Sequence, residues 1–217
     1  MNVSKAVVAR RSIRSFLNTP VSDEQISQLL EKAARAPSGG NVQPWRVFVI
    51  NGPTMPSFHQ FLADTDPRET PAYEIYPKEL TSPYRDSRFK VGEDMYKLLN
   101  IPRDDKTSRF AHLARNFKFF DAPAAFFCFI DKTMGPPQWS DLGMFLQTFM
   151  LLAQEEGLDT CAQEAWANRS QAVANFVSAE DNLMLFCGMA IGHKNPEADV
   201  NSLVSDREPL DNWAKFV

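Results

Sequence analysis

Three arginines stand close together near the N-terminus, in the stretch Arg10-Arg11-Ser12-Ile13-Arg14. Guanidinium groups crowded at this spacing repel one another. They gain most when they share a dianion, because each can donate two parallel hydrogen bonds to phosphate oxygens. A solvated basic turn is the common alternative. The stretch therefore indicates either a local phosphate site or an ordinary charged turn.

A second stretch, Pro37 to Trp45 with the sequence PSGGNVQPW, combines turn residues with hydrogen-bonding groups. Gly39 and Gly40 permit positive φ angles and close approach to the backbone, while Ser38 and Asn41 supply donors and acceptors. Such a segment can hold a flat polar ligand. An ordinary connection between a helix and a strand fits the same residues, and the stretch alone favours that simpler interpretation.

Other familiar kinds of active site lack support in this sequence. None of the nine glycines forms a GxGxxG or GxxxxGK loop, and no serine lies in a GxSxG elbow. His59, His112 and His193 form neither an HExxH pattern nor a Cys/His ligand spacing, so we assign no metal. A phosphate site and a ligand cradle without an acid, base or nucleophile indicate that a cofactor carries the reaction.

Length and composition fit one sizeable domain: the chain has 217 residues, 44% hydrophobic and 23% charged. The net charge of −4 gives no general basic field, so we expect neither nucleic acid nor an anionic membrane as a partner.

Three cysteines without CxxC spacing indicate buried thiols in a reducing compartment. The N-terminus lacks the apolar core of a signal peptide, and no apolar stretch reaches the ~20 residues that span a bilayer. We therefore expect a cytoplasmic protein.

Hydrophobic periodicity and turn residues predict alternating helices and strands. A capping box, S-x-x-Q at Ser22 to Gln25, opens a helix that ends at Pro37. Leu142 to Gln154 is apolar on nearly every side, with Gln147 the polar exception, and predicts a helix buried in the core or at a subunit contact. The remaining predicted helices lie near residues 3–8, 58–62, 90–99, 103–117 and 170–177, and the predicted buried strands at 46–50, 124–130, 158–163 and 183–191.

Two segments do not fit this regular pattern. Residues 64–88 contain four prolines and three tyrosines, and we interpret them as a lid or flank of a pocket, with Tyr84 and Arg85 as candidate contacts for an aromatic, anionic substrate. A solvated loop is the alternative. Residues 195–217 carry isolated large apolar side chains, including Trp213 and Phe216, that should dock on the same domain or on a neighbour.

The stretches RRSIR and PSGGNVQPW, in this order and spacing, resemble the FMN-dependent nitroreductase family. The resemblance continues through QEAWA, MAIGH and the terminal NSLVSDREPLDNW. It implies an α+β homodimer in which helices surround a mixed central sheet. It also implies one FMN-binding domain over residues 1–217, FMN at the subunit interface, and a C-terminal arm docked on the partner subunit.

The resemblance also implies roles for particular residues. The phosphate and ribityl end of FMN would be held by Arg10, Arg11, Ser12, Arg14 and Arg207. The loop residues Pro37, Ser38, Gly39 and Asn41 would reach the FMN bound mainly by the other subunit. Gln147 would lie near the cofactor, and Gln163 and Glu164 match the segment whose backbone N–H faces flavin N5.

Two positions depart from the family pattern. Ala165 stands where some members have glycine, which leaves open which amide faces N5. Ser205 stands where some members have a lysine, which leaves more of the phosphate charge for Arg207 to balance.

The activity implied is ping-pong reduction: NADH or NADPH passes a hydride to N5, and a small nitroaromatic compound or a quinone then accepts electrons. No side chain of the protein would be catalytic. A dehalogenating or flavin-cleaving enzyme of the same fold is one alternative, and a non-catalytic flavin-binding sensor or storage protein is another.

Overall fold

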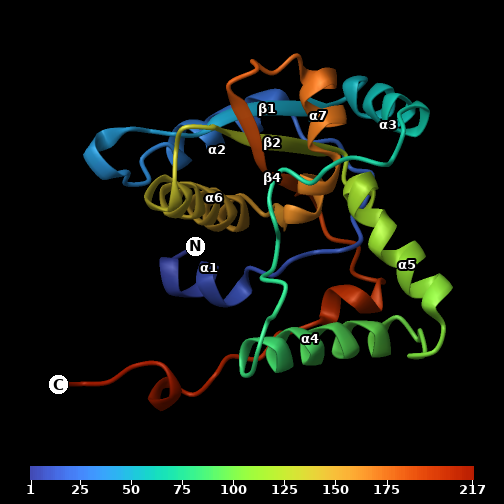
Figure 1. Cartoon of the computed structure of the whole chain (residues 1–217), viewed down its shortest axis with the longest axis vertical. Helices are drawn as coiled ribbons and strands as arrows, with labels where there is room; N and C mark the ends of the chain where they lie inside the picture. The colour runs from blue at the N-terminus through green and yellow to red at the C-terminus, as the bar shows by residue number, and fades with distance from the viewer.

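The computed structural model describes all residues from 1 to 217, and it shows a four-stranded sheet covered by helices, with a separate lower layer of helices (Figure 1). The sheet contains β1 (Arg46–Asn51), β2 (Ala124–Asp131), β3 (Asp159–Gln163) and β4 (Leu183–Gly192). The helices are α1 (Val3–Ala9), α2 (Asp23–Ala33), α3 (Thr54–Asp64), α4 (Tyr84–Leu98), α5 (Lys106–Ala114), α6 (Pro136–Glu155) and α7 (Ser170–Val177). Short 3-10 turns are η1 (Gly39–Asn41), η2 (Arg115–Asp121), η3 (Glu164–Arg169), η4 (Asp199–Ser202) and η5 (Leu210–Asn212).

The sheet has the strand order β1-β2-β4-β3, and every neighbouring pair is antiparallel. The α+β class is confirmed, but the expected mixed sheet needs correction for this chain. The only parallel pairing is an isolated bridge between Ser12 and Thr160. Strand direction depends on the long connections between strands, and a continuous apolar run such as β2 is also typical of parallel strands buried on both faces.

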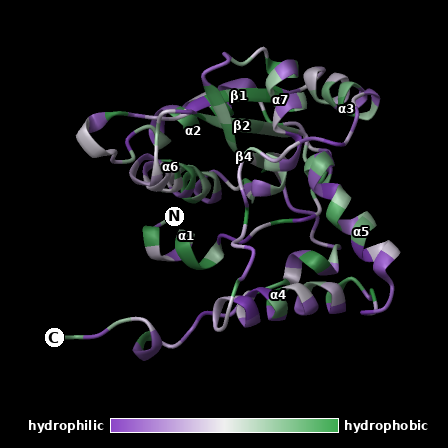
Figure 2. Ribbon diagram, in the orientation of Figure 1, coloured by the Kyte–Doolittle hydropathy of each residue, from purple (hydrophilic) through white to green (hydrophobic).

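Strand β2 is the centre of the core, because nearly all of its residues are buried. Its successive side chains point to opposite faces of the sheet. Phe127 and Phe129 join the core on the side of α3 and α7, while Phe126 and Cys128 join the core on the side of α2 and α6. Figure 2 shows the resulting band of apolar residues through the sheet and its covering helices.

Strand β1 corrects the expectation of a buried strand over 46–50. It lies at the edge of the sheet, only Ile50 in it is buried, and Val49 keeps 39% of its surface exposed. β-Branched and aromatic residues favour strands at edges as well as in centres, so composition alone did not distinguish the two.

Local sequence signals set several helix boundaries. The predicted capping box is present: Gln25 N–H donates to Ser22 Oγ at 3.1 Å, and Ser22 N–H donates to Gln25 Oε1 at 3.1 Å. Helix α6 opens with two prolines in its first turn, where a missing N–H removes no intrahelical bond.

Residues 64–88 are only partly irregular. The segment crosses the front of the molecule from α3 to the lower layer (Figure 1), and its last residues already belong to α4, which begins at Tyr84.

Helix α5 is shorter than the expected helix over 103–117. Beyond it the chain turns through η2, where Phe119 and Phe120 have φ angles of 49° and 54°. Both rings are fully buried, which holds this turn in place.

The C-terminal residues leave the body of the molecule as an extended arm (Figure 1). Trp213 is 69% exposed and Phe216 94% exposed, so neither docks on its own domain. No helix in the chain has the length and apolarity that crossing a membrane requires.

Gly188 offers a direct test of the core described here. A Cβ atom at this position would lie 2.3 Å from Cδ1 of Trp166, a fully buried ring. Gly188→Ala should therefore lower the free energy of unfolding by about 1–3 kcal/mol, as overpacking does in close-packed interiors. Urea denaturation measures the change. Gly92→Ala in α4 is the matched control: its Cβ would meet no atom within 4 Å, and it should raise stability by about 0.5–1 kcal/mol.

Candidate functional site

The arginine stretch follows directly after α1 and lies against the free edge of β3. Arg10 is the C-cap residue of α1. Ile13 then points into the core, 2% exposed, and its N–H donates to the carbonyl of Thr160 at 3.0 Å. This pairing fixes the backbone, so that the polar neighbours of Ile13 can face outward.

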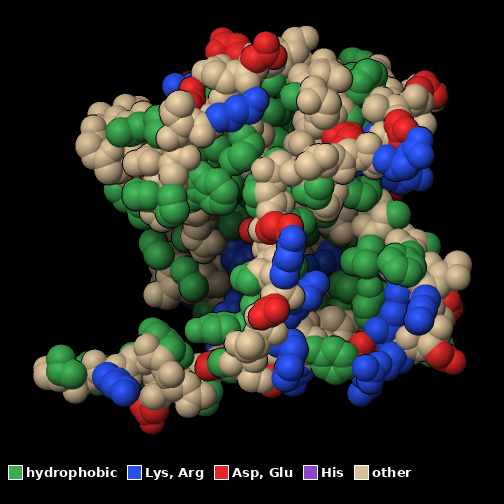
Figure 3. Space-filling view, in the orientation of Figure 1, with side chains coloured by type: hydrophobic (Ala, Val, Ile, Leu, Met, Phe, Trp, Pro, Cys, Tyr) green, Lys and Arg blue, Asp and Glu red, His purple; other side chains and the backbone are tan.

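These residues line a cavity of about 580 Å³, which we call the arginine cavity. Its polar lining comes from three distant parts of the chain: the stretch after α1, the middle of α6, and the C-terminal segment. Figure 3 shows Lys and Arg side chains gathered in the hollow between the upper body and the lower helices. The lining residues are Val7, Val8, Arg10, Arg11, Ser12, Arg14, Val91, Gln147, Leu203, Val204, Ser205 and Arg207.

The four guanidinium groups of the arginine cavity have no carboxylate partner. None of them forms an ion pair within 4.0 Å. Burial, followed by the neighbouring charge of Arg207, lowers the pKa of Arg10. Like charges held together without a counterion form a site where an anion is strongly favoured.

Backbone and hydroxyl oxygens position these side chains. Arg14 Nη1 donates to the Ser12 carbonyl at 3.1 Å, and Arg207 Nη1 donates to Ser205 Oγ at 2.8 Å. The Arg14 N–H donates to Asn201 Oδ1 at 2.9 Å. Sequence reasoning missed Asn201, although it lies in the terminal stretch that carries the family resemblance.

Gln147, which the family resemblance would place near the cofactor, is the residue that α6 contributes to the arginine cavity. It projects from α6 into the arginine cavity, and its side chain forms no hydrogen bond within the protein. An amide with free donor and acceptor groups at such a wall can meet a polar ligand.

The loop of Pro37, Ser38, Gly39 and Asn41 is not part of the arginine cavity. Its second half forms the exposed turn η1, and Gly39 N–H donates to the buried Asp141 of α6 at 3.2 Å. The ring of Trp45, which ends the stretch, stacks on Phe145 of α6 at 4.9 Å. Within one chain, these contacts hold the loop on α6, away from the arginine cavity of the same chain.

Gln163 and Glu164 lie at the end of β3, three and four residues after the Thr160 that pairs with the arginine stretch. Gln163 Nε2 donates to the Asn116 carbonyl at 2.8 Å, whereas its buried Oε1 has no partner. Glu164 begins η3, so its N–H has no intrahelical acceptor. Its side chain forms no hydrogen bond or ion pair, and burial raises the pKa of its carboxyl group.

Tyr84 and Arg85 lie outside the arginine cavity, exposed at the start of α4. Arg85 Nε donates to its neighbour Asp86 at 3.0 Å. The segment instead places Arg88 over the ring of Tyr76, 4.1 Å from the centroid. This pair lines a second hollow of about 540 Å³ that shares Val91, Ser205 and Arg207 with the arginine cavity.

The three cysteines are buried, as expected, and none has an activated thiol. Burial raises the pKa of Cys128, Cys161 and Cys187, that of Cys187 to about 12. They act as small apolar core residues.

Comparison with known proteins identifies relatives that match nearly the whole chain. The chain is 36% identical over 213 residues to a 4-nitrobenzoate reductase of Pseudomonas putida, a match that covers 97% of this chain and 93% of that protein. It is 32% identical to a nitrobenzene nitroreductase of Ectopseudomonas oleovorans over 96% of this chain and 93% of that one. The crystal structure of an FMN- and NADPH-dependent nitroreductase, NfnB from sphigopyxis sp. strain HMH, is 40% identical. It superposes with a TM-score of 0.95 and covers 100% of this chain and 99% of that one.

The sequence model of the nitroreductase family matches residues 7–193, which include the arginine stretch, the PSGGNVQPW loop and all four strands. The match thus spans most of the structure described above. This chain belongs to the nitroreductase family.

Proposed function

We propose that this protein is an FMN-dependent NAD(P)H oxidoreductase that reduces nitroaromatic compounds, and also quinones. The observation that carries the proposal is the arginine cavity, in which four guanidinium groups without a carboxylate partner converge from opposite ends of the chain. The names of the relatives support a nitroaromatic acceptor, and the FMN- and NADPH-dependent structural neighbour supports FMN as cofactor and a reduced nicotinamide as electron donor.

The residues fit the phosphate and ribityl end of FMN. Arg10, Arg11, Arg14 and Arg207 would supply charge-assisted hydrogen bonds to the phosphate, and the Ser12 hydroxyl would supply one more donor. FMN has no adenine half, and the chain contains no dinucleotide-binding loop to hold one. Burial, and after it repulsion from Arg207, lowers the pKa of Arg10, and bound phosphate charge would offset the repulsion.

The remaining candidate residues would hold the rest of the cofactor. Gln147 would contact it from α6, and the Glu164 N–H at the start of η3 would face flavin N5, beside Gln163. Bound FMN supplies the hydride and electron transfer between NADH or NADPH and the acceptor. The protein contributes binding, orientation and a shielded surface for stacking, and none of its side chains serves as an acid, base or nucleophile.

We also propose that the protein is a homodimer with a shared site. The loop of Pro37, Ser38, Gly39 and Asn41 is fixed on α6 outside the arginine cavity of its own chain, which suits a contact with the FMN of a partner. In the expected C-terminal arm, residues 195–217, the first part packs on its own chain through Asn201, whereas the exposed Trp213 and Phe216 suit docking on the other subunit. Light scattering should give about twice 24.6 kDa. A monomer that binds FMN tightly would contradict the shared site.

Residues 1–217 would form one FMN-binding domain, and we place it in the cytoplasm because its buried, reduced cysteines fit a reducing compartment. Tyr84 and Arg85, exposed on the lid segment 64–88, would contact the acceptor. Arg85→Ala should then lower kcat/KM for 4-nitrobenzoate more than for nitrobenzene, since only the former carries a carboxylate. Equal effects on both acceptors would remove Arg85 from the substrate site.

The central test is the visible spectrum and turnover of the purified protein. It should be yellow, release FMN on denaturation, and oxidise NADH or NADPH steadily only when a nitroarene or quinone is added. Release of FAD would refute the cofactor assignment. Tight FMN binding without turnover would support a storage or sensor protein instead.

Arg14→Ala and Arg207→Ala test the phosphate contacts. Each removes a charge-assisted partner worth roughly 1.5–3 kcal/mol, so the Kd for FMN should rise about 10- to 150-fold in a fluorescence titration. Arg35→Ala is the matched control, because Arg35 is exposed near the end of α2 and forms no ion pair or side-chain hydrogen bond. Unchanged FMN affinity in both site variants would overturn the assignment.

A further inference from the structure

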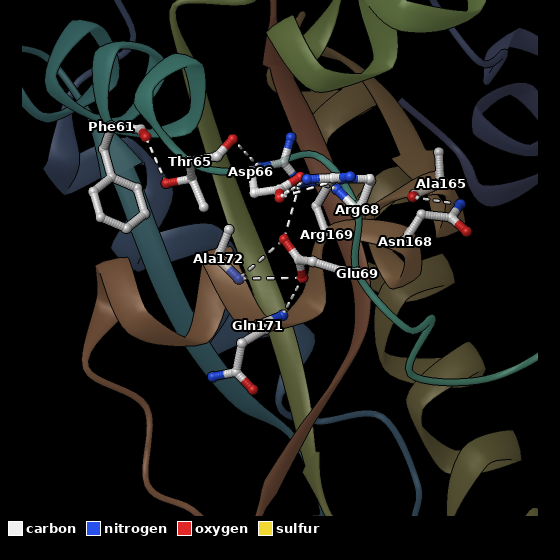
Figure 4. A network of polar contacts seen from close by, with 10 residues as sticks. All are labelled: Phe61, Thr65, Asp66, Arg68, Glu69, Ala165, Asn168, Arg169, Gln171 and Ala172. Carbon is white, nitrogen blue, oxygen red and sulfur yellow. Dashed lines mark hydrogen bonds and ion pairs between the residues drawn. The ribbon is translucent and has the colours of Figure 1, made fainter.

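The chain between α3 and α4 is fastened to the body of the molecule over residues 65–73, which we call the strap. Figure 4 shows its central contacts, which join Thr65 and Glu69 to the turn η3 and to the start of α7. Nothing in the composition of the strap, which is rich in proline and polar residues, indicated such an attachment.

Glu69 makes most of these contacts with one carboxylate. Its Oε1 accepts from Arg169 Nε at 3.0 Å, and its Oε2 accepts from the N–H of Gln171 at 2.7 Å. The N–H of Ala172 lies 3.4 and 3.3 Å from the two oxygens. The carboxylate therefore caps α7, whose own N-cap residue makes no side-chain cap.

The pair of Glu69 and Arg169 is almost fully enclosed. Their side chains are 10% and 9% exposed, in contrast to the surface ion pair of Arg68 and Asp66 in the same strap. Removing one partner of such a pair leaves a buried charge without compensation, whereas exposed pairs contribute little.

Two further bonds attach the strap to the same region. Ala72 N–H donates to the Ala167 carbonyl within η3 at 2.9 Å, and the Tyr73 hydroxyl donates to the Phe186 carbonyl of β4. The ring of Tyr73 packs against Trp139, with centroids 5.6 Å apart. The strap, η3 and the start of α7 are thus bonded into one unit.

We propose that Glu69 is a positioning residue that holds η3 in place, and with it the Glu164 N–H at the first position of that turn. The inference rests on the proposed function, because it is the FMN site that gives this N–H its role. Arg169 ends the same 3-10 turn that Glu164 begins, so a carboxylate fixed on Arg169 limits movement of the whole turn. Glu69 acts through η3 and touches neither cofactor nor substrate.

Hydrogen exchange on the apoprotein tests, without FMN, whether Glu69 holds η3 in place. Glu69→Gln keeps the shape of the side chain but removes its charge, so amide exchange over residues 164–172 should become about tenfold or more faster than in the wild type. Glu79→Gln is the matched control. Glu79 is exposed in the segment between the strap and α4, and it makes no ion pair or side-chain hydrogen bond. Exchange unchanged at 164–172, or raised equally over the whole chain, would overturn the proposal.

The flavin reduction potential, measured with FMN at saturation, tests whether Glu69 thereby positions the Glu164 N–H. The Glu69→Gln holoprotein should show a shifted potential and a lower kcat, whereas its Kd for FMN should stay close to that of the wild type, because the arginine cavity is unchanged. Glu69→Asp, which keeps the charge, should recover part of the shift. Faster exchange with an unaltered potential would reduce Glu69 to a purely structural role and refute the proposal. A wild type that bound no FMN would refute the proposed function, yet leave the exchange result standing.

Discussion

The layout of this chain follows from one constraint: β2 is apolar on both faces, so both faces must be covered. Phe127 and Phe126 point to opposite sides, and each side has its own closely packed core. Helix α6 covers one side and also carries Gln147, so the helix that completes the core also supplies a wall of the arginine cavity. On the other side, Trp166 fills the space beside Gly188 and anchors η3 within the core. Core packing and site geometry are thus set by the same elements.

The sequence predicted those parts of the fold whose signals are local. The Ser22 capping box, the apolar strand β2 and the α6 helix are all present, because capping and hydrophobic period act over a few residues. The edge position of β1 and the antiparallel sheet were not predicted, since both depend on which strands meet over long distances. The start of α4 at Tyr84 was missed because it follows a run of prolines and opens with polar residues.

The residues of the candidate site likewise fall into those that local sequence indicated and those that it did not. The arginine stretch stands out by composition, but only the family resemblance indicated that Arg207 joins it from the other end of the chain. Glu69 gave no signal at all, because its partner Arg169 lies 100 residues away and a single acidic residue in a proline-rich segment resembles a solvated one. Side chains whose roles depend on distant partners are visible only after folding. The hollow lined by Tyr76 and Arg88 belongs to this group too.

The isolated bridge between Ser12 and Thr160 has a consequence for how copies of the chain meet one another. Strand β3 ends the sheet, and its outer backbone groups would otherwise be open to pairing with a strand of another molecule. The arginine stretch occupies that edge, offers a single paired position, and then presents charged side chains in place of a further strand. Residues suited to an anion therefore also cover the edge of the sheet, through the backbone pairing at Ser12 and Ile13. The same short stretch thus lines the arginine cavity with its side chains and closes a sheet edge with its backbone.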